Sequence, residues 1–177
     1  MAGSSGSLVG KMVKASKLDV DFYEEVEADK DATTQAFLVV VLSSLAAGIG
    51  LGLQALLLGD GGINIVWGLI GGVLSAIVMW GVFAWLTYFV GTKLFAGPET
   101  SADWGELLRT LGFSTAPGVL RIIPILNFFV FIWMVVTAVI AVRQALDFTT
   151  WRAIGTILVA IIPTLIIQFL VMGLLGF

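Results

Sequence analysis

Apolar and polar residues are segregated into long blocks along this chain. A mixed segment of 34 residues comes first, and five apolar stretches follow it. Each stretch is about long enough to cross a hydrocarbon core roughly 30 Å thick. None alternates apolar and polar residues as the strands of a membrane barrel do. The pattern therefore predicts an all-α, polytopic transmembrane helical bundle with five spans, at about 35–58, 63–90, 107–123, 128–146 and 153–175.

The third predicted span is the least regular of the five. It contains Arg121 and Pro117, and Pro124 follows it directly. Because proline removes a backbone donor, we expect a short, kinked helix that faces its neighbours or a polar cavity, and not lipid on all sides. Arg121 is expected near the outer end of this helix, with its stem reaching the headgroups. In the alternative, a four-span arrangement, residues 107–120 enter the bilayer and return.

The distribution of lysine and arginine orients these spans. With five spans and a cytoplasmic N-terminus, eight of the nine basic residues fall on the inside, and only Arg121 falls outside. The four-span alternative leaves two outside. The positive-inside rule therefore favours five spans with the N-terminus in and the C-terminus out, in the cytoplasmic (inner) membrane. The domain division predicted is a cytoplasmic segment, residues 1–34, and a membrane domain, residues 35–177.

Two features stand out in the N-terminal segment. Lys11, Lys14 and Lys17 alternate with apolar residues at near-helical spacing, which predicts a short amphipathic helix. That helix lies either in the headgroup layer or on the protein's own loops. The acidic residues 19–31 that follow predict a solvated helix face or, alternatively, a site for a partner.

Composition limits the chemistry available. Hydrophobic residues make up 59% of the chain and charged residues 12%, against about 25% charged in a soluble domain. There is no cysteine and no histidine, which excludes disulfides, thiol nucleophiles, imidazole bases and the usual zinc and haem ligands. The carboxylates all lie in the N-terminal segment, in loops or at span ends. We therefore expect no active site, no metal, no cofactor and no nucleic-acid partner.

Small residues recur at every fourth position in the first two spans. Such rows let helix backbones approach closely in a membrane, where burial of apolar surface supplies no attraction between helices. The rows serve either to pack the two spans against each other or to dock another protein. They are Ser44, Gly48 and Gly52 in the first span, and Gly68, Gly72 and Ala76 in the second.

The stretch LLRTLGFSTAPGVL resembles the signature of the Yip-domain family, membrane proteins named for interacting with Ypt/Rab GTPases. A helix ending in leucine, glycine and an aromatic residue leads there to a small residue and proline. The residues that carry the resemblance are Leu111, Gly112, Phe113, Ala116 and Pro117.

A second similarity lies in FFVFIWMVVTAVIAVRQALDFTTWRAI, through Trp133, Arg152 and Ala153. The resemblance implies an acidic N-terminal segment, five spans and, in eukaryotic relatives, roles in vesicle traffic. Phe113 stands where those relatives have tyrosine, so GTPase binding is not carried over to this bacterial-looking chain.

The function expected from these features is binding without catalysis. The first hypothesis is a membrane-organising or protein-binding scaffold. An accessory subunit of a larger membrane complex is the alternative, and a small pore or carrier is the second alternative. The partners expected are the lipid bilayer and other membrane proteins or further copies of this chain.

Overall fold

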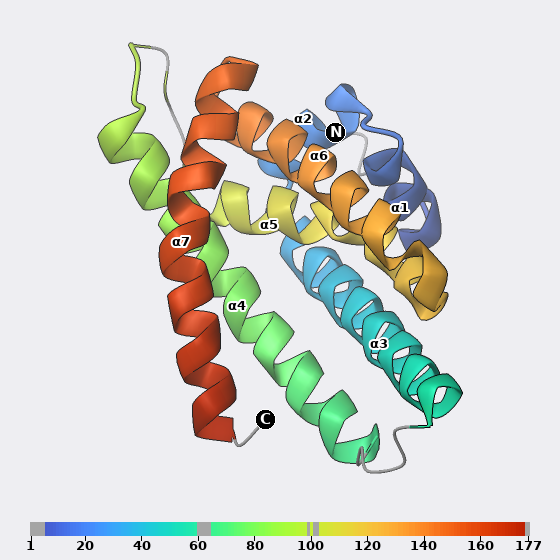
Figure 1. Ribbon diagram of the computed structural model, residues 1–177. Helices are drawn as coiled ribbons and strands as arrows, with labels where there is room; N and C mark the ends of the chain where they lie inside the picture. The colour runs from blue at the N-terminus through green and yellow to red at the C-terminus, as the bar shows by residue number, and fades with distance from the viewer. Residues whose placement is uncertain (1–5, 60–64, 99, 101–102, 176–177) are drawn as a thin grey trace.

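A computed structural model describes residues 6–59, 65–98, 100 and 103–175 of the chain. Within these residues the protein is helical and contains no strand (Figure 1). The helices are α1 (Leu8–Ser16), α2 (Val20–Ala28), α3 (Ala32–Leu58), α4 (Ile65–Leu94), α5 (Trp104–Ser114), α6 (Asn127–Ala145) and α7 (Thr150–Leu175), with two 3-10 helices, η1 (Ala116–Ile122) and η2 (Pro124–Leu126), between α5 and α6.

Four helices among the described residues are long and apolar enough to cross a membrane. They are α3, most of α4, α6 together with η2, and most of α7. Their positions agree with the first, second, fourth and fifth predicted spans. The prediction of five spanning helices is wrong, because the third predicted span consists of the 11-residue α5 followed by the 3-10 helix η1.

The two prolines explain this break. Pro117 has no N–H to donate to the carbonyl four residues earlier, and its ring clashes with that carbonyl, so α5 ends before it. Pro124 then restricts the residue before it, and Ile123 is extended, with φ −99° and ψ 104°. The segment thus remains apolar but cannot form one continuous α-helix.

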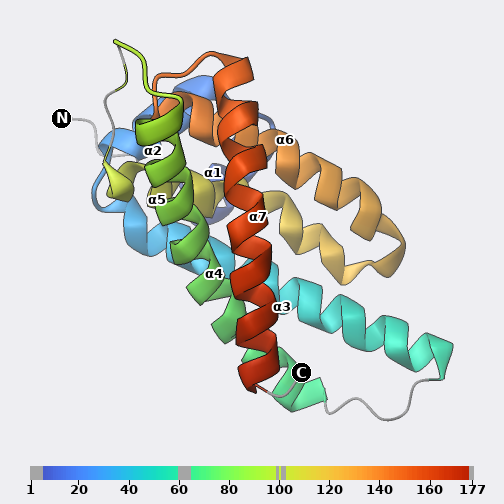
Figure 2. The ribbon, with the colours of Figure 1, turned by 60° about the vertical axis from the view of Figure 1, so that its left-hand side comes forward.

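The segment made of α5 and η1 nevertheless runs alongside α3 in the same direction. Gly112 lies against Ala36, near the start of α3, and the Arg121 carbonyl lies against Gly50, further along it. Residues 107–120 do not turn back on themselves; α6 makes the return. As a result, α1 and α2 lie at one end of the bundle and the last turns of α7 at the other (Figures 1 and 2).

The N-terminal helices pack on the protein itself. Of α1, Lys11, Met12 and Ala15 are buried, and the helix contacts α2, α5, η1 and α6. The packing expected on the protein's own loops is thus present, but it is made with helices. Lys14 and Lys17 remain exposed.

Candidate functional site: a cavity inside the bundle

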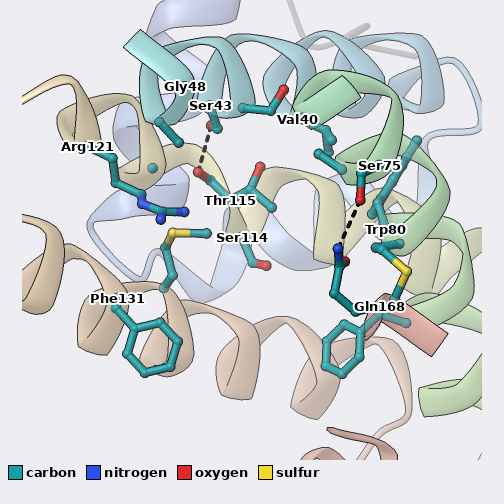
Figure 3. Close-up of a pocket in the computed structure, with 18 of the residues that line it drawn as sticks. Val40, Ser43, Gly48, Ser75, Trp80, Ser114, Thr115, Arg121, Phe131 and Gln168 are labelled. Atoms are coloured by element: carbon teal, nitrogen blue, oxygen red, sulfur yellow. Dashed lines mark hydrogen bonds between the residues drawn. The ribbon is translucent and has the colours of Figure 1, made fainter. Parts of the chain in front are cut away.

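A cavity of about 810 Å³ lies between α3 and α4 on one side and α6 and α7 on the other (Figure 3). Residues of α5 and η1 also line it, and it is partly open to the outside. Its lining is mostly apolar. Proteins hold small molecules and cofactors in cavities of roughly 300–1,000 Å³ with a mainly apolar lining and few polar groups.

The two small-residue rows differ in what lies against them. A Cβ built on Gly48 would lie 2.6 Å from Leu69 Cδ2, so the two helices are in close contact there. In contrast, a Cβ on Gly68 or Gly72 would meet nothing within 4 Å. Both glycines line the cavity.

The remaining members of the two rows differ in whether they line the cavity. Ser44 and Ala76 line the cavity, whereas Gly52 is buried and does not line it. The row on α4 therefore lines the cavity, and the described residues place no atom against Gly68 or Gly72.

Arg121 is the cationic residue of the cavity. Its guanidinium points from η1 into the space between α3 and α6 (Figure 3). Its Nε donates a hydrogen bond of 3.2 Å to Asn127 Oδ1, the side-chain interaction that the described residues provide for it.

Arg121 was expected at the outer end of a continuous third span, and the structure has it near the end of the 3-10 helix η1 instead. The 3-10 helix η1 brings Arg121 beside Gly50, eight residues before the end of α3 at Leu58. At about 1.5 Å of rise per residue, this is roughly 12 Å short of that end. The half-buried side chain lines the cavity because η1 and η2 turn the chain back before α3 ends.

The other polar groups of the cavity are mostly satisfied within the protein. Ser43 Oγ donates to the Thr115 carbonyl at 2.8 Å, and Ser114 Oγ donates to the Leu111 carbonyl at 2.8 Å. Gln168 Nε2 donates to Ser75 Oγ at 3.1 Å, which joins α7 to α4 (Figure 3). The described lining contains no acidic side chain. The guanidinium is thus the group with donors to spare.

The residues of the LGF…AP stretch serve packing, and Leu111 among them also lines the cavity. Leu111, Phe113, Ala116 and Pro117 are buried, and Phe113 is fully so. The Phe113 ring packs edge-on against Phe22 of α2, with centroids 5.3 Å apart.

Glycine at position 112 lets two helices cross closely. A Cβ built on Gly112 would lie 2.7 Å from the Cβ of Ala36 and 3.2 Å from the Trp80 ring. A larger residue would push α5 away from α3.

The second group of family residues is divided between contact and exposure. The Trp133 indole donates to the Ser16 carbonyl at 2.8 Å and so holds the end of α1. Ala153 is fully buried, whereas Arg152 is exposed. The structure therefore gives Trp133 a role that its apolar sequence context did not indicate.

Arg109 is buried and holds the end of α2. Its Nε donates to the Val26 carbonyl at 3.2 Å, and Nη2 donates to the Glu27 carbonyl. A cation at the C-terminal end of a helix also interacts favourably with the helix dipole. This residue fastens α2 to α5 and does not line the cavity.

Two ionisable groups near this contact are perturbed by burial. Burial raises the pKa of Tyr23, whose hydroxyl donates to the Ala15 carbonyl at 3.3 Å. Burial also raises the pKa of Glu27 to about 7, with the nearby carboxylates of Glu106 and Asp147 adding to the rise and Arg109 opposing it. No group of three or more His, Cys, Asp or Glu residues in the described parts of the chain is arranged to hold a metal ion.

Sequence reasoning singled out the two small-residue rows but missed the cavity. The signal was present: Gly68, Gly72 and Ser75 share one helix face, and the broken third segment contains an arginine. Only the spatial path of η1, however, brings Arg121 to that face.

Comparison with known proteins identifies the family. The family model of the Yip1 domain matches residues 19–173, and that range includes all the residues on which the sequence resemblance was based. No curated protein and no solved structure gives a significant match. With its four long apolar helices, this chain is a membrane protein that belongs to the Yip1 domain family.

Proposed function

We propose that this protein is a non-catalytic, membrane-organising scaffold that holds another component of the membrane against the open face of α4. The observation that carries the proposal is the empty space at Gly68 and Gly72, where an added Cβ would meet nothing. Small residues on a membrane helix favour close contact with a neighbour, and the described part of the chain supplies none at these two glycines.

The orientation proposed has α1 and α2 in the cytoplasm and the end of α7 outside, in the cytoplasmic membrane. The excess of lysine and arginine at the end that carries α1 and α2 supports this orientation. It is also supported by the path of the chain, in which those helices and the last turns of α7 lie at opposite ends.

A small pore or carrier is the second candidate, and Arg121 favours it. An ionisable group inside a helix bundle marks the path of a substrate or ion in many membrane proteins. Flux of a solute through liposomes that contain the purified protein would support this candidate over the scaffold.

The scaffold proposal is tested by filling the open face. Gly72→Leu places a side chain in the cavity, and Gly81→Leu is the matched control, because Gly81 lies on the same helix, has open space around it and does not line the cavity. Each form is purified from membranes in mild detergent, and its bound proteins and lipids are identified by native mass spectrometry.

We expect the wild type and Gly81→Leu to retain a component that Gly72→Leu loses. A retained membrane protein present in fixed ratio would identify the chain as a subunit of a complex. If the three forms carry the same bound components, the open face of α4 is not a binding surface and the proposal is wrong.

A further inference from the structure

We infer that the cavity binds an anionic phospholipid, with the phosphate on Arg121 and an acyl chain along the small-residue face of α4. The inference rests on the proposed function and specifies the component that is held. It follows from the charge, the length and the opening of the cavity.

The charge of the cavity selects an anion. A guanidinium has five N–H donors, and the hydrogen bond to Asn127 uses only Nε. The two terminal nitrogens match two oxygens of a phosphate, a geometry in which charge-assisted hydrogen bonds are strong. The described lining offers no carboxylate to compete for them.

The length of the cavity suits one acyl chain. On α3 its lining extends from Val40 to Leu51, eleven residues apart, which is about 16 Å at roughly 1.5 Å per residue. One leaflet of a bilayer has a hydrocarbon depth of about 15 Å, half of a core of about 30 Å. Arg121 lies level with Gly50, near one end of this length, so the cavity has a charged end and an apolar body, as a lipid has.

The cavity opens where lipid has access to it. α6 and α7 are close at the loop that joins them and diverge toward their other ends (Figures 1 and 2). Along the divergent parts, the cavity residues Phe131 and Val135 of α6 are exposed on an apolar surface. A ligand with an acyl chain can therefore enter sideways from the bilayer, whereas a free phosphate would have to leave water for an apolar space.

Arg121→Gln tests the headgroup contact, because glutamine keeps a polar side chain and removes the positive charge. Arg152→Gln is the matched control, since Arg152 is exposed in the first turn of α7 and does not line the cavity. The full-length proteins are placed in mixed micelles that contain equal amounts of phosphatidylglycerol and phosphatidylcholine, and the lipid retained on each is counted by native mass spectrometry.

We expect the wild type and Arg152→Gln to retain phosphatidylglycerol in about tenfold preference, the effect of one charged hydrogen-bonded contact. In Arg121→Gln the two lipids should be retained equally, and Arg121→Lys, which keeps the charge without the paired donors, should show an intermediate preference. Millimolar inorganic phosphate should not displace the lipid. Displacement would mean that the site recognises free phosphate and would overturn the inference.

The outcomes separate the inference from the proposed function. An unchanged preference in Arg121→Gln overturns the inference, and the scaffold then stands only if Gly72→Leu still loses a bound protein. If Gly72→Leu loses no component of any kind, both are wrong. Should Arg121→Gln fail to fold, as judged by its circular dichroism, the test passes to two variants that keep the charge. Arg121→Lys tests the paired donors, and Gly72→Leu tests the space for the acyl chain.

Discussion

The two ends of this molecule differ in how completely the chain uses its own surfaces. At one end, α1 and α2 meet α5 and α6, and we call this the interlocked end. Polar groups there, such as Arg109 and Trp133, bond to backbone carbonyls of other helices. Toward the other end, α4 and α7 diverge from α6, and glycines on α4 face open space. The first end is thus built to be stable, whereas the second leaves surface available for binding.

This difference bears on the meaning of the family residues. All five are buried: Leu111, Gly112, Phe113, Ala116 and Pro117. Phe113 packs against Phe22 of α2 and Gly112 against Ala36 of α3, and Leu111 also lines the cavity. We therefore expect substitutions in the stretch to affect folding, and substitutions at the cavity to affect what is bound.

Phe113→Ala should give the largest loss of stability. The ring is fully buried and packs against Phe22, and removal of a buried phenylalanine costs about 3–5 kcal/mol. The measurement is denaturant unfolding in detergent, with Phe169→Ala as control because that ring is 77% exposed. Equal stability of the two variants would mean that the end with α1 and α2 is not the stable part.

Arg109→Met should have the next largest effect. It leaves the carbonyls of Val26 and Glu27 without their charged donor, at a cost of about 1.5–3 kcal/mol. Hydrogen exchange should also become faster in α2 while α7 stays unchanged. Arg152→Met, at an exposed arginine, is the control; a similar loss there would show that charge alone, and not the contact with α2, is responsible.

The raised pKa of Glu27 should make the free energy of unfolding depend on pH. Its pKa is raised from 4.5 to about 7 in the folded protein, so the folded state binds this proton more tightly than the unfolded state. The free energy of unfolding should therefore fall as pH rises from about 4.5 to 7, and the stabilisation should be absent above that range.

Glu27→Gln should remove this part of the pH dependence and stabilise the protein at pH 8. Thermal unfolding midpoints at pH 5 and pH 8 provide the measurement. Glu25→Gln is the control, because Glu25 is exposed on the same helix. If Glu27→Gln keeps the slope of the wild type, another group titrates in this range.

The sequence predicted the long helices well because their signal is local. Four apolar stretches became α3, α4, α6 and α7 with ends within a few residues of those expected. The third stretch was equally apolar, so its hydropathy predicted a spanning helix. Its prolines indicated an irregularity, but the same prolines are compatible with a kinked α-helix and with a 3-10 helix.

The cavity was beyond sequence reasoning for a different reason. A row of small residues shows that close approach is possible but does not say whether a neighbour approaches. Gly48 has Leu69 against it, whereas Gly72, in a similar row, has nothing. Arg121 was likewise expected at the end of a regular helix, and the sequence did not indicate that η1 would direct its side chain into the cavity.

Gly72→Ala should have the smallest effect, and it tests most directly whether α4 is open at this glycine while α5 is packed at Gly112. An added methyl group there meets nothing within 4 Å, so the variant gains the helix propensity of alanine, about 0.5–1 kcal/mol, without a clash. Gly112→Ala makes the same chemical change at the interlocked end. It places the new methyl group 2.7 Å from the Cβ of Ala36, so it should destabilise the protein. The unfolding free energies of the two variants should therefore move in opposite directions from that of the wild type. If Gly72→Ala is also destabilising in detergent, α4 has a neighbour at that face in the purified protein, such as a second copy of the chain, and the face is not open.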